Sequence, residues 1–368
     1  IYNDVITKIV EREKVGRKWT PELNETHKPV RFFVSGSGGC GKSLLIEAID
    51  TKLNELYNPK GDKLVVLKLG PTAIAGTNIG GNTIHKAFNI TTQTPGPFTR
   101  HRKPNGTQLE VMRNAYSDLL LVVIDEISMV SNILFAMLEE ILTSIFPPSK
   151  EQLMHNDVCD HWRLFGGMNI ITVGDFMQLP PVNAPYIYET ITTQTAQNIF
   201  GCTGIPNQWV HFSFYILQQI MRQQGNSLLC ELLDRVRFNK LTEEDLVILR
   251  KCLLKMKHRA DYSQKSVTAI VDQYVSKSKK NKGTIMLTGL RVYVKKLNEE
   301  VLSRQEGDTV EIRATDSMNE TNTRRFKKLK PKRGNKNGPK ITKDERSTAG
   351  LEEVLYFKKG SKVMLRSN

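Results

Sequence analysis

The residues of this chain with the clearest chemistry form a glycine-rich run at positions 36–43. The run reads GSGGCGKS and fits the pattern G-x-x-x-x-G-K-[ST] in full. Glycines let backbone N–H groups surround phosphate oxygens, and the start of a following helix adds partial positive charge. We expect Lys42 to reach the β- and γ-phosphates of ATP and Ser43 to ligate Mg²⁺. The residues expected to bind the nucleotide are Gly36, Ser37, Gly38, Gly39, Cys40, Gly41, Lys42 and Ser43.

An acidic pair, Asp125-Glu126, follows the apolar run LLLVVI at residues 119–124. Side chains at the carboxyl end of a strand in a doubly wound sheet face the ligand crevice. We therefore expect Asp125 to hold Mg²⁺, through water, and Glu126 to position and activate the attacking water. The alternative is a solvated acidic pair that caps the next helix.

A glutamine, Gln178, lies in the segment GDFMQLPPV at residues 174–182. Its amide can both donate and accept a hydrogen bond, so it suits sensing the γ-phosphate or orienting water without proton transfer. Spacing alone makes this a weaker indication than the glycine-rich loop.

Continuous apolar runs predict the strands that position these residues. Such runs are typical of parallel α/β sheets that are covered on both faces. The predicted strands are 31–35, 64–69, 119–124 and 169–173. Helical periodicity is expected at 42–56 and at 133–145, which Pro147-Pro148 ends. Residues 1–10 read as an amphipathic helix with Ile1, Val5, Ile6 and Ile9 on one face.

A length of 368 residues predicts two domains, each with its own core. The character of the sequence changes after Phe212, so we expect domains at 1–212 and 213–368. In the second, Thr242 reads as a helix N-cap, followed by acidic residues where the helix dipole favours them. The stretches 277–282 and 324–346 are rich in lysine and arginine. Three interpretations of residues 324–340 stay open: a nuclear localisation patch, a track for the DNA backbone or a solvated insertion.

The formal net charge of +15 favours a polyanionic partner, because each neutralised phosphate releases counterions. Charge alone does not choose DNA over RNA or an acidic membrane. No apolar run is long enough to cross a bilayer. Five scattered cysteines without a CxxC pair predict no disulfide framework and a reducing compartment. A metal-like cluster, His155, Asp157, Cys159 and His161, lacks a second ligand pair and reads as a solvated loop.

In this order, GSGGCGKS, IDEISMV and GDFMQLPPV resemble motifs I, II and III of superfamily 1 DNA helicases. More narrowly, they resemble the petite-integration-frequency type, close to the RecD branch. Residues 70–85, GPTAIAGTNIGGNTIH, are similar to motif Ia, and residues 217–223, LQQIMRQ, are similar to motif IV. The stretch 134–167, ending in FGG, resembles the signature region of this type. Related segments occur in rolling-circle (Helitron-type) transposon proteins, and the resemblance extends to those.

The resemblance implies an α/β fold of the RecA-like P-loop NTPase class, with a parallel sheet flanked by helices. It implies a first RecA-like domain, 1A, at 1–212 and an incomplete second one, 2A, at 213–368. Lys42, Ser43, Asp125, Glu126 and Gln178 would form the first half of the ATP site, and Arg222 would act as an arginine finger. The residues implied to contact single-stranded DNA are Thr72, Asn78 and His85. For His85, the alternative is a helix-capping histidine.

The implied activity is an ATP-dependent, 5′-to-3′ DNA helicase or translocase with Mg²⁺, intracellular and nuclear. Motifs V and VI and the adenine-reading glutamine of the family do not occur in the chain, so we expect it to be part of a longer polypeptide. Two other functions stay open. One is a DNA-dependent ATPase switch that does not unwind, and the other is a DNA-binding module with a silent ATP site.

Overall fold

The structure of the protein is a computed structural model that describes most of the chain. The described residues are 1–16, 27–90, 101, 103–148, 163–219, 221, 227–252, 263–281, 283–313 and 354–361. The chain divides into two compact units, unit 1 (Ile1–Leu246) and unit 2 (Val247–Asn368).

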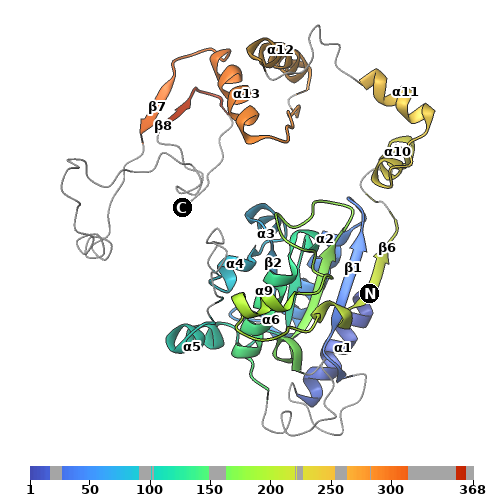
Figure 1. The fold of residues 1–368 in the computed structure, drawn as a ribbon, viewed down its shortest axis with the longest axis vertical. Coiled ribbons are helices and arrows are strands. Elements are labelled where there is room, and N and C mark those ends of the chain that lie inside the picture. The colour runs from blue at the N-terminus through green and yellow to red at the C-terminus, as the bar shows by residue number, and fades with distance from the viewer. Residues whose placement is uncertain are drawn as a thin grey trace, which may run out of the picture. The chain divides into compact units, whose positions relative to one another are not determined.

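The described part of unit 1 contains a six-stranded parallel sheet in the order β3-β2-β4-β5-β1-β6 (Figure 1). The strands are β1 (Arg31–Gly36), β2 (Val66–Gly70), β3 (Asn82–Thr83), β4 (Leu121–Ile124), β5 (Asn169–Gly174) and β6 (Ser213–Leu217). The four strands predicted from apolar runs are β1, β2, β4 and β5, and β4 is buried along its whole length. The predicted α/β fold with a parallel sheet is confirmed.

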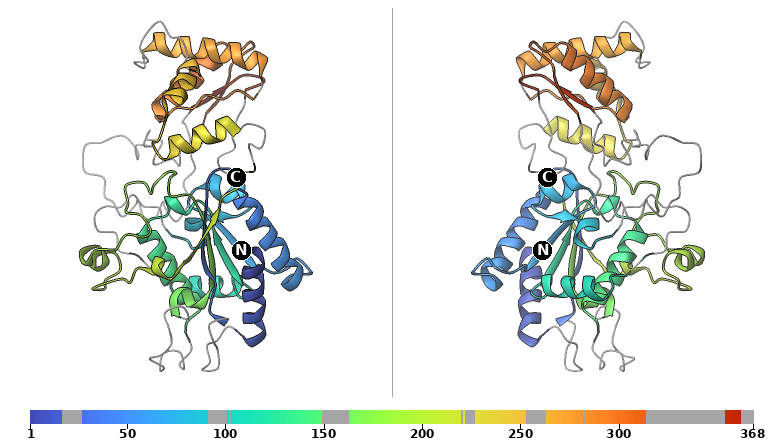
Figure 2. Two further views of the ribbon diagram at one scale, coloured as in Figure 1. Left: turned by 90° about the vertical axis from the view of Figure 1, so that its right-hand side faces the viewer. Right: turned by 90° about the vertical axis from the view of Figure 1, so that its left-hand side faces the viewer.

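Helices cover both faces of this sheet (Figure 2). One apolar cluster joins α1 (Tyr2–Val15) and α2 (Lys42–Tyr57) to the sheet, and a second joins α4 (Ile84–Ala87) and α6 (Asn132–Ile145) to it. In Figure 2 the blue helices α1 and α2 lie on the opposite side of the sheet from the green helix α6. The other described helices of the sheet region are α3 (Ala73–Asn78), α5 (Gly106–Ala115), α9 (Thr193–Ile199), η2 (Ile127–Met129), η3 (Leu164–Gly167) and η4 (Gln208–His211).

The ends of the predicted helices follow from local chemistry. In α1, Val5 and Ile9 are fully buried against the sheet, as the amphipathic pattern predicts. Helix α6 begins after Ser131, whose hydroxyl accepts a hydrogen bond from the Leu134 amide at 3.1 Å, and ends at Ile145, shortly before Pro147. An N-cap serine supplies an acceptor that the first turn of a helix otherwise lacks.

The division between the units comes later in the chain than the sequence predicts. Strand β6 begins at Ser213, directly after the expected boundary, yet it pairs with β1 from Phe32↔Ser213 to Gly36↔Leu217. It therefore completes the sheet of unit 1 instead of opening a second domain. The chain continues through α10 (Ser227–Arg237) and α11 (Glu243–Cys252), and α11 spans the division.

The predicted N-cap of α11 is confirmed as a reciprocal pair. The Thr242 hydroxyl accepts from the Asp245 amide at 3.2 Å, and the Asp245 carboxylate accepts from the Thr242 amide at 3.0 Å. Two backbone donors at the start of the helix are satisfied in this way.

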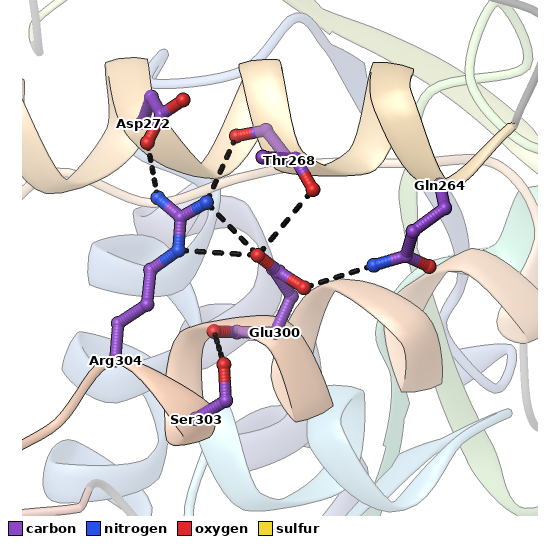
Figure 3. A network of polar contacts seen from close by, with 6 residues as sticks. All are labelled: Gln264, Thr268, Asp272, Glu300, Ser303 and Arg304. Carbon is purple, nitrogen blue, oxygen red and sulfur yellow. Dashed lines mark hydrogen bonds and ion pairs between the residues drawn. The ribbon is translucent and has the colours of Figure 1, made fainter.

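The described part of unit 2 holds α12 (Gln264–Lys280), α13 (Arg291–Ser303) and an antiparallel pair, β7 (Val310–Arg313) and β8 (Val354–Phe357). Its buried cluster is small and centres on Val267, Val271 and Leu297. A polar network joins α12 to α13 (Figure 3). In it Glu300 accepts from Gln264 at 2.9 Å and from Arg304 at 2.9 Å, and Arg304 also contacts Asp272 and the Thr268 carbonyl.

Within these ranges, no helix is both long and apolar enough to span a membrane. The same residues contain no group of three or more His, Cys, Asp or Glu side chains that could hold a metal ion. The metal-like residues His155, Asp157, Cys159 and His161 and the basic stretch 324–346 lie outside the described residues.

Candidate nucleotide site

The predicted site residues follow the carboxyl ends of the parallel strands. The glycine-rich loop leaves β1, the acidic pair leaves β4, and the segment with Gln178 leaves β5. In the sheet order, β1 lies beside β5, and β5 lies beside β4. Parallel strands end at one edge of their sheet, so the fold brings the three segments together at the edge where doubly wound sheets bind their ligands.

The backbone of the glycine-rich loop has the conformation of an anion cradle. Gly39 and Gly41 have φ values of 85° and 91°, which side chains with a Cβ rarely adopt. Gly41 is the N-cap of α2, and no side chain caps this helix. The first N–H groups of α2 therefore have no partner within the helix and can bind an anion.

Lys42 and Cys40 have different roles in this loop. The Lys42 ammonium group donates to the carbonyls of Gly36 and Ser37 at 2.7 and 2.9 Å, so its charge lies over the loop. Cys40 is buried, with 6% of its surface exposed, and a Cβ placed on Gly36 would meet its sulfur. Cys40 is thus a packing residue beneath the loop, and Ser43 is exposed at the start of α2.

The acidic pair is held firmly where β4 ends. The Asp125 amide donates to the Leu69 carbonyl at 2.9 Å, and the Asp125 carboxylate accepts from the Glu126 amide at 2.9 Å. Glu126 has a φ of 51°, an unusual conformation for a residue with a side chain. Such outliers are concentrated at functional sites.

Burial sets the electrostatics of the pair. It raises the pKa of Asp125, which is 6% exposed, and the Lys42 charge opposes that rise. Burial raises the pKa of Glu126 too, as do the negative charges of Asp125 and Asp175, whereas Lys42 lowers it. A cation at this edge would stabilise both carboxylates in their ionised form.

Gln178 is exposed, and its position depends on Asp175. The Gln178 side-chain amide donates to one Asp175 oxygen at 3.2 Å, and the Met177 backbone amide donates to the other at 3.0 Å. Arg237 forms an ion pair with Asp175 at 2.6 Å. Sequence reasoning missed both Asp175 and Arg237. Asp175 carries the same signal as Asp125, an acid directly after a buried strand, but nothing in the sequence joins it to Arg237.

The predicted arginine finger, Arg222, lies outside the described residues, and its role stays a prediction. The residue before it is described. The Met221 amide donates to the Gly39 carbonyl at 2.8 Å, so the chain that follows β6 meets the glycine-rich loop.

The predicted DNA contacts lie beyond the carboxyl end of β2, on α3 and α4. Thr72 and Asn78 are exposed, at the N-cap and the last residue of α3. The Thr72 hydroxyl accepts from the Ala75 amide at 3.2 Å, so it also caps that helix. His85 is half-buried in α4, and burial lowers its pKa. Thr83 is the N-cap of α4, and its hydroxyl accepts from the Lys86 amide at 3.1 Å, whereas His85 lies within the helix, in its last turn.

The residues present fit a nucleotide with Mg²⁺. The open helix N-terminus and Lys42 suit phosphate, and the Ser43 hydroxyl and the Asp125 carboxylate are the oxygen ligands that Mg²⁺ prefers. Lys42 and the acidic pair are close enough for their charges to influence one another. Two opposite charges at one edge are what a metal–phosphate ligand requires.

Comparisons with known proteins agree with this geometry. A family model described as "PIF1-like helicase" matches residues 11–243. The chain is 27% identical over 240 residues to the ATP-dependent DNA helicase RRM3 of Saccharomyces cerevisiae, a match that covers 64% of this chain and 28% of that protein. It is 36% identical over 153 residues to the ATP-dependent DNA helicase PIF1 of Emericella nidulans, covering 41% of this chain and 18% of the relative. The chain thus spans less than a third of these relatives.

Among solved structures, the chain is similar to the Pif1 helicase from Candida albicans. The TM-score is 0.53 and the sequence identity is 20%, over 89% of this chain and 60% of that one. The likeness supports the RecA-like fold that the sheet order shows.

Proposed function

The chain belongs to the PIF1-like helicase family, and from that premise we propose that it couples ATP hydrolysis to 5′-to-3′ movement along single-stranded DNA. The observation that carries the proposal is the convergence of three segments at one edge of the sheet. The Gly36–Ser43 loop, the pair Asp125-Glu126 and Gln178 supply a phosphate cradle, carboxylates and a polar amide.

Each residue has a role that its surroundings support. Lys42 and the N-terminus of α2 bind the phosphates and stabilise the charge that develops as the γ-phosphoryl group leaves. Ser43 and Asp125 would hold Mg²⁺, which neutralises phosphate charge when it is bound. Glu126 accepts a proton from the attacking water, and Gln178 orients that water. The raised pKa of Glu126 matches a group that must take up a proton.

The second half of the site belongs to the part of the chain after β6. We assign the first RecA-like domain, 1A, to the sheet region of unit 1, extended through β6, and the partial second domain, 2A, to the residues that follow. Arg222 would act across the two as an arginine finger, a device worth about 10³ to 10⁵ in rate in well-studied phosphoryl transfer. The bond between the Met221 amide and Gly39 supports this role, because it ties the preceding residue to the phosphate loop.

Single-stranded DNA is the proposed partner at α3 and α4. The exposed side chains of Thr72 and Asn78 can donate to phosphate oxygens. Because its pKa is lowered, His85 is uncharged near neutral pH, so it suits a base or sugar contact better than an ion pair with phosphate. The net charge of +15 supports a nucleic-acid partner. A nuclear site of action stays a prediction.

The first test is steady-state ATP hydrolysis with and without single-stranded DNA, with Lys42→Ala as the blank. We expect hydrolysis that DNA stimulates, that EDTA abolishes and that falls by about 10² or more in Lys42→Ala, because each lost transition-state contact costs about 3–4 kcal/mol. Hydrolysis that survives Lys42→Ala would show that the glycine-rich loop is not the site.

Directional unwinding needs a separate assay. Duplexes with a 5′ or a 3′ single-stranded tail should be separated with ATP only when the tail is 5′. DNA-stimulated hydrolysis without strand separation on either substrate would instead indicate an ATPase switch that does not unwind.

A further inference from the structure

A buried carboxylate, Asp175, stands between the predicted water-orienting residue and the end of α10. Its side chain is 3% exposed. Three donors reach its two oxygens. The Met177 amide and Arg237 donate to Oδ1, and the Gln178 side-chain amide donates to Oδ2. Buried carboxylates need such donors to remain ionised, so this set of contacts fixes the Asp175 side chain in one orientation.

The Asp175 carboxylate also decides which end of the Gln178 amide faces it. An ionised carboxylate only accepts hydrogen bonds, so Gln178 must present its NH₂ group at Oδ2. The carbonyl end, Oε1, then faces away, and no donor from the described residues reaches it. Gln178 is exposed, so this acceptor is open to a water molecule. With the amide reversed, a donor would stand where an acceptor is needed.

Arg237 is the one charged partner of Asp175 in the described structure, and it comes from a distant part of the chain. It is the last residue of α10, 62 positions after Asp175, and its side chain is 23% exposed. Its guanidinium lies over the Phe238 ring, 5.3 Å from the centroid, and its Nε is buried without a hydrogen-bond partner among the described residues. A buried donor without a partner costs stability. The ion pair with Asp175, at 2.6 Å, compensates for this loss of stability.

We propose that Arg237 is a positioning residue for ATP hydrolysis, which holds Asp175 in place and thereby keeps the Oε1 acceptor of Gln178 available to the attacking water. The inference rests on the proposed function and adds to it a residue outside the helicase motifs. It also makes the alignment of Gln178 depend on α10, the segment that leads through α11 into unit 2.

The same helix supplies a matched control. Arg235, two positions earlier, also forms ion pairs, but its partners are Asp245, at 2.7 and 2.8 Å, and Glu231 of the same helix, at 3.4 Å. The pair with Asp245 joins α10 to the capped start of α11, and neither pair touches the segment after β5. Arg235→Ala therefore removes an arginine ion pair from α10 and leaves the contacts of Asp175 unchanged.

The experiment compares ATP turnover in Arg237→Ala, Gln178→Ala, the double variant and Arg235→Ala, each with saturating single-stranded DNA. We expect Arg237→Ala to lower kcat about 10- to 100-fold, with the KM for ATP changed by less than about threefold, since a positioning residue acts on the transition state. In the Gln178→Ala background the same substitution should change kcat by less than about twofold, because residues that act as one unit are not additive. Arg235→Ala should turn over ATP like the unaltered chain.

An additive result would overturn the inference. If the double variant loses the full product of the two single effects, Arg237 supports only the fold. Arg237→Lys, which keeps the charge but not the planar fork, should recover part of kcat, and it serves as the test variant if Arg237→Ala does not fold. If the unaltered chain shows no Lys42-dependent turnover, the proposed function fails and this inference fails with it. Lys42-dependent turnover with additive losses would reject the inference alone.

Discussion

The two ends of the sheet in unit 1 carry polar side chains of similar types, but they use them differently. At the carboxyl ends of the strands, Ser43 and Gln178 are exposed, and Glu126 is half-buried. At the amino ends, Arg12, Arg31 and Asn169 are each no more than 2% exposed, and most of their polar atoms bond to backbone groups. Residues with exposed donors and acceptors can bind a ligand, whereas these three buried side chains form their hydrogen bonds within the protein and hold the chain together.

The network at the amino ends centres on η3. Arg12 donates to the Gly167 carbonyl at 2.6 Å, and Arg31 donates to the carbonyls of Leu164, at 2.8 Å, and Met168. Burial lowers the pKa of Arg31, and the nearby Arg12 charge adds to that effect, while Glu139 opposes it. Glu139 in turn accepts from the Phe165 amide at 3.3 Å. The FGG segment, which ends the stretch that resembles a family signature, is thus held in place by buried arginines. Its contacts in the structure are those of a structural element.

The largest effect expected from this comparison is that of Asn169→Ala. The Asn169 side chain accepts from Arg12 at 3.1 Å and from the Val30 amide at 2.9 Å, and it donates to the Leu120 carbonyl at 2.8 Å. Alanine would remove all three of these buried hydrogen bonds. We expect the free energy of unfolding of unit 1 to fall by about 3–5 kcal/mol, because unpaired buried groups cost about 1–3 kcal/mol each and are not fully additive. Urea titration of the chain measures it.

Asn58→Ala is the matched control for that prediction. Asn58 also makes three hydrogen bonds, to Asn54 and to both backbone groups of Lys63, but it lies near the surface. Water can replace its contacts, so the loss should be about 1 kcal/mol or less. If both variants lose the same free energy of unfolding, burial does not make the hydrogen bonds at the amino ends of the strands more important than those near the surface.

A smaller effect is expected at Gly166, inside η3. Its φ is 60°, and a Cβ at this position would lie 2.5 Å from the Phe146 carbonyl oxygen. Gly166→Ala should therefore lower the free energy of unfolding by about 2–3 kcal/mol through backbone strain and overpacking. Gly204→Ala, where a Cβ would meet nothing within 4 Å, should change it by less than about 0.5 kcal/mol. If Gly166→Ala leaves the free energy of unfolding unchanged, η3 can move away from Phe146, and the arginine network does not hold it rigidly.

The sequence predicts the carboxyl end of the sheet far better than the amino end. The strands β1, β2, β4 and β5 are predictable because burial on both faces requires continuous apolar runs. Strand β6 also has an apolar run, at residues 214–217, but it lies at the edge of the sheet, where Phe214 and Ile216 are 57% and 55% exposed, so burial on both faces does not account for it. The Gly36–Ser43 loop is a local pattern, so it can be read from neighbouring residues. The burial of Arg31 cannot be predicted in this way, because it depends on carbonyls more than 130 positions away in the sequence. Contacts of this range need the fold itself.

The smallest effect is expected at Thr72, which combines a structural hydrogen bond with an exposed position where a ligand can bind. Thr72 lies at the carboxyl end of the sheet, yet its hydroxyl caps α3. Thr72→Ala should cost about 1 kcal/mol of stability through the lost cap. If the hydroxyl also donates to DNA, single-stranded DNA should bind about tenfold more weakly, since a hydrogen bond to a charged group is worth about 1.5–3 kcal/mol. Thr83→Ala removes the equivalent cap of α4 at 3.1 Å and should reduce stability alone. If Thr72→Ala matches Thr83→Ala in both stability and DNA affinity, the hydroxyl of Thr72 serves structure only, and the contrast between the two ends of the sheet does not hold at this position.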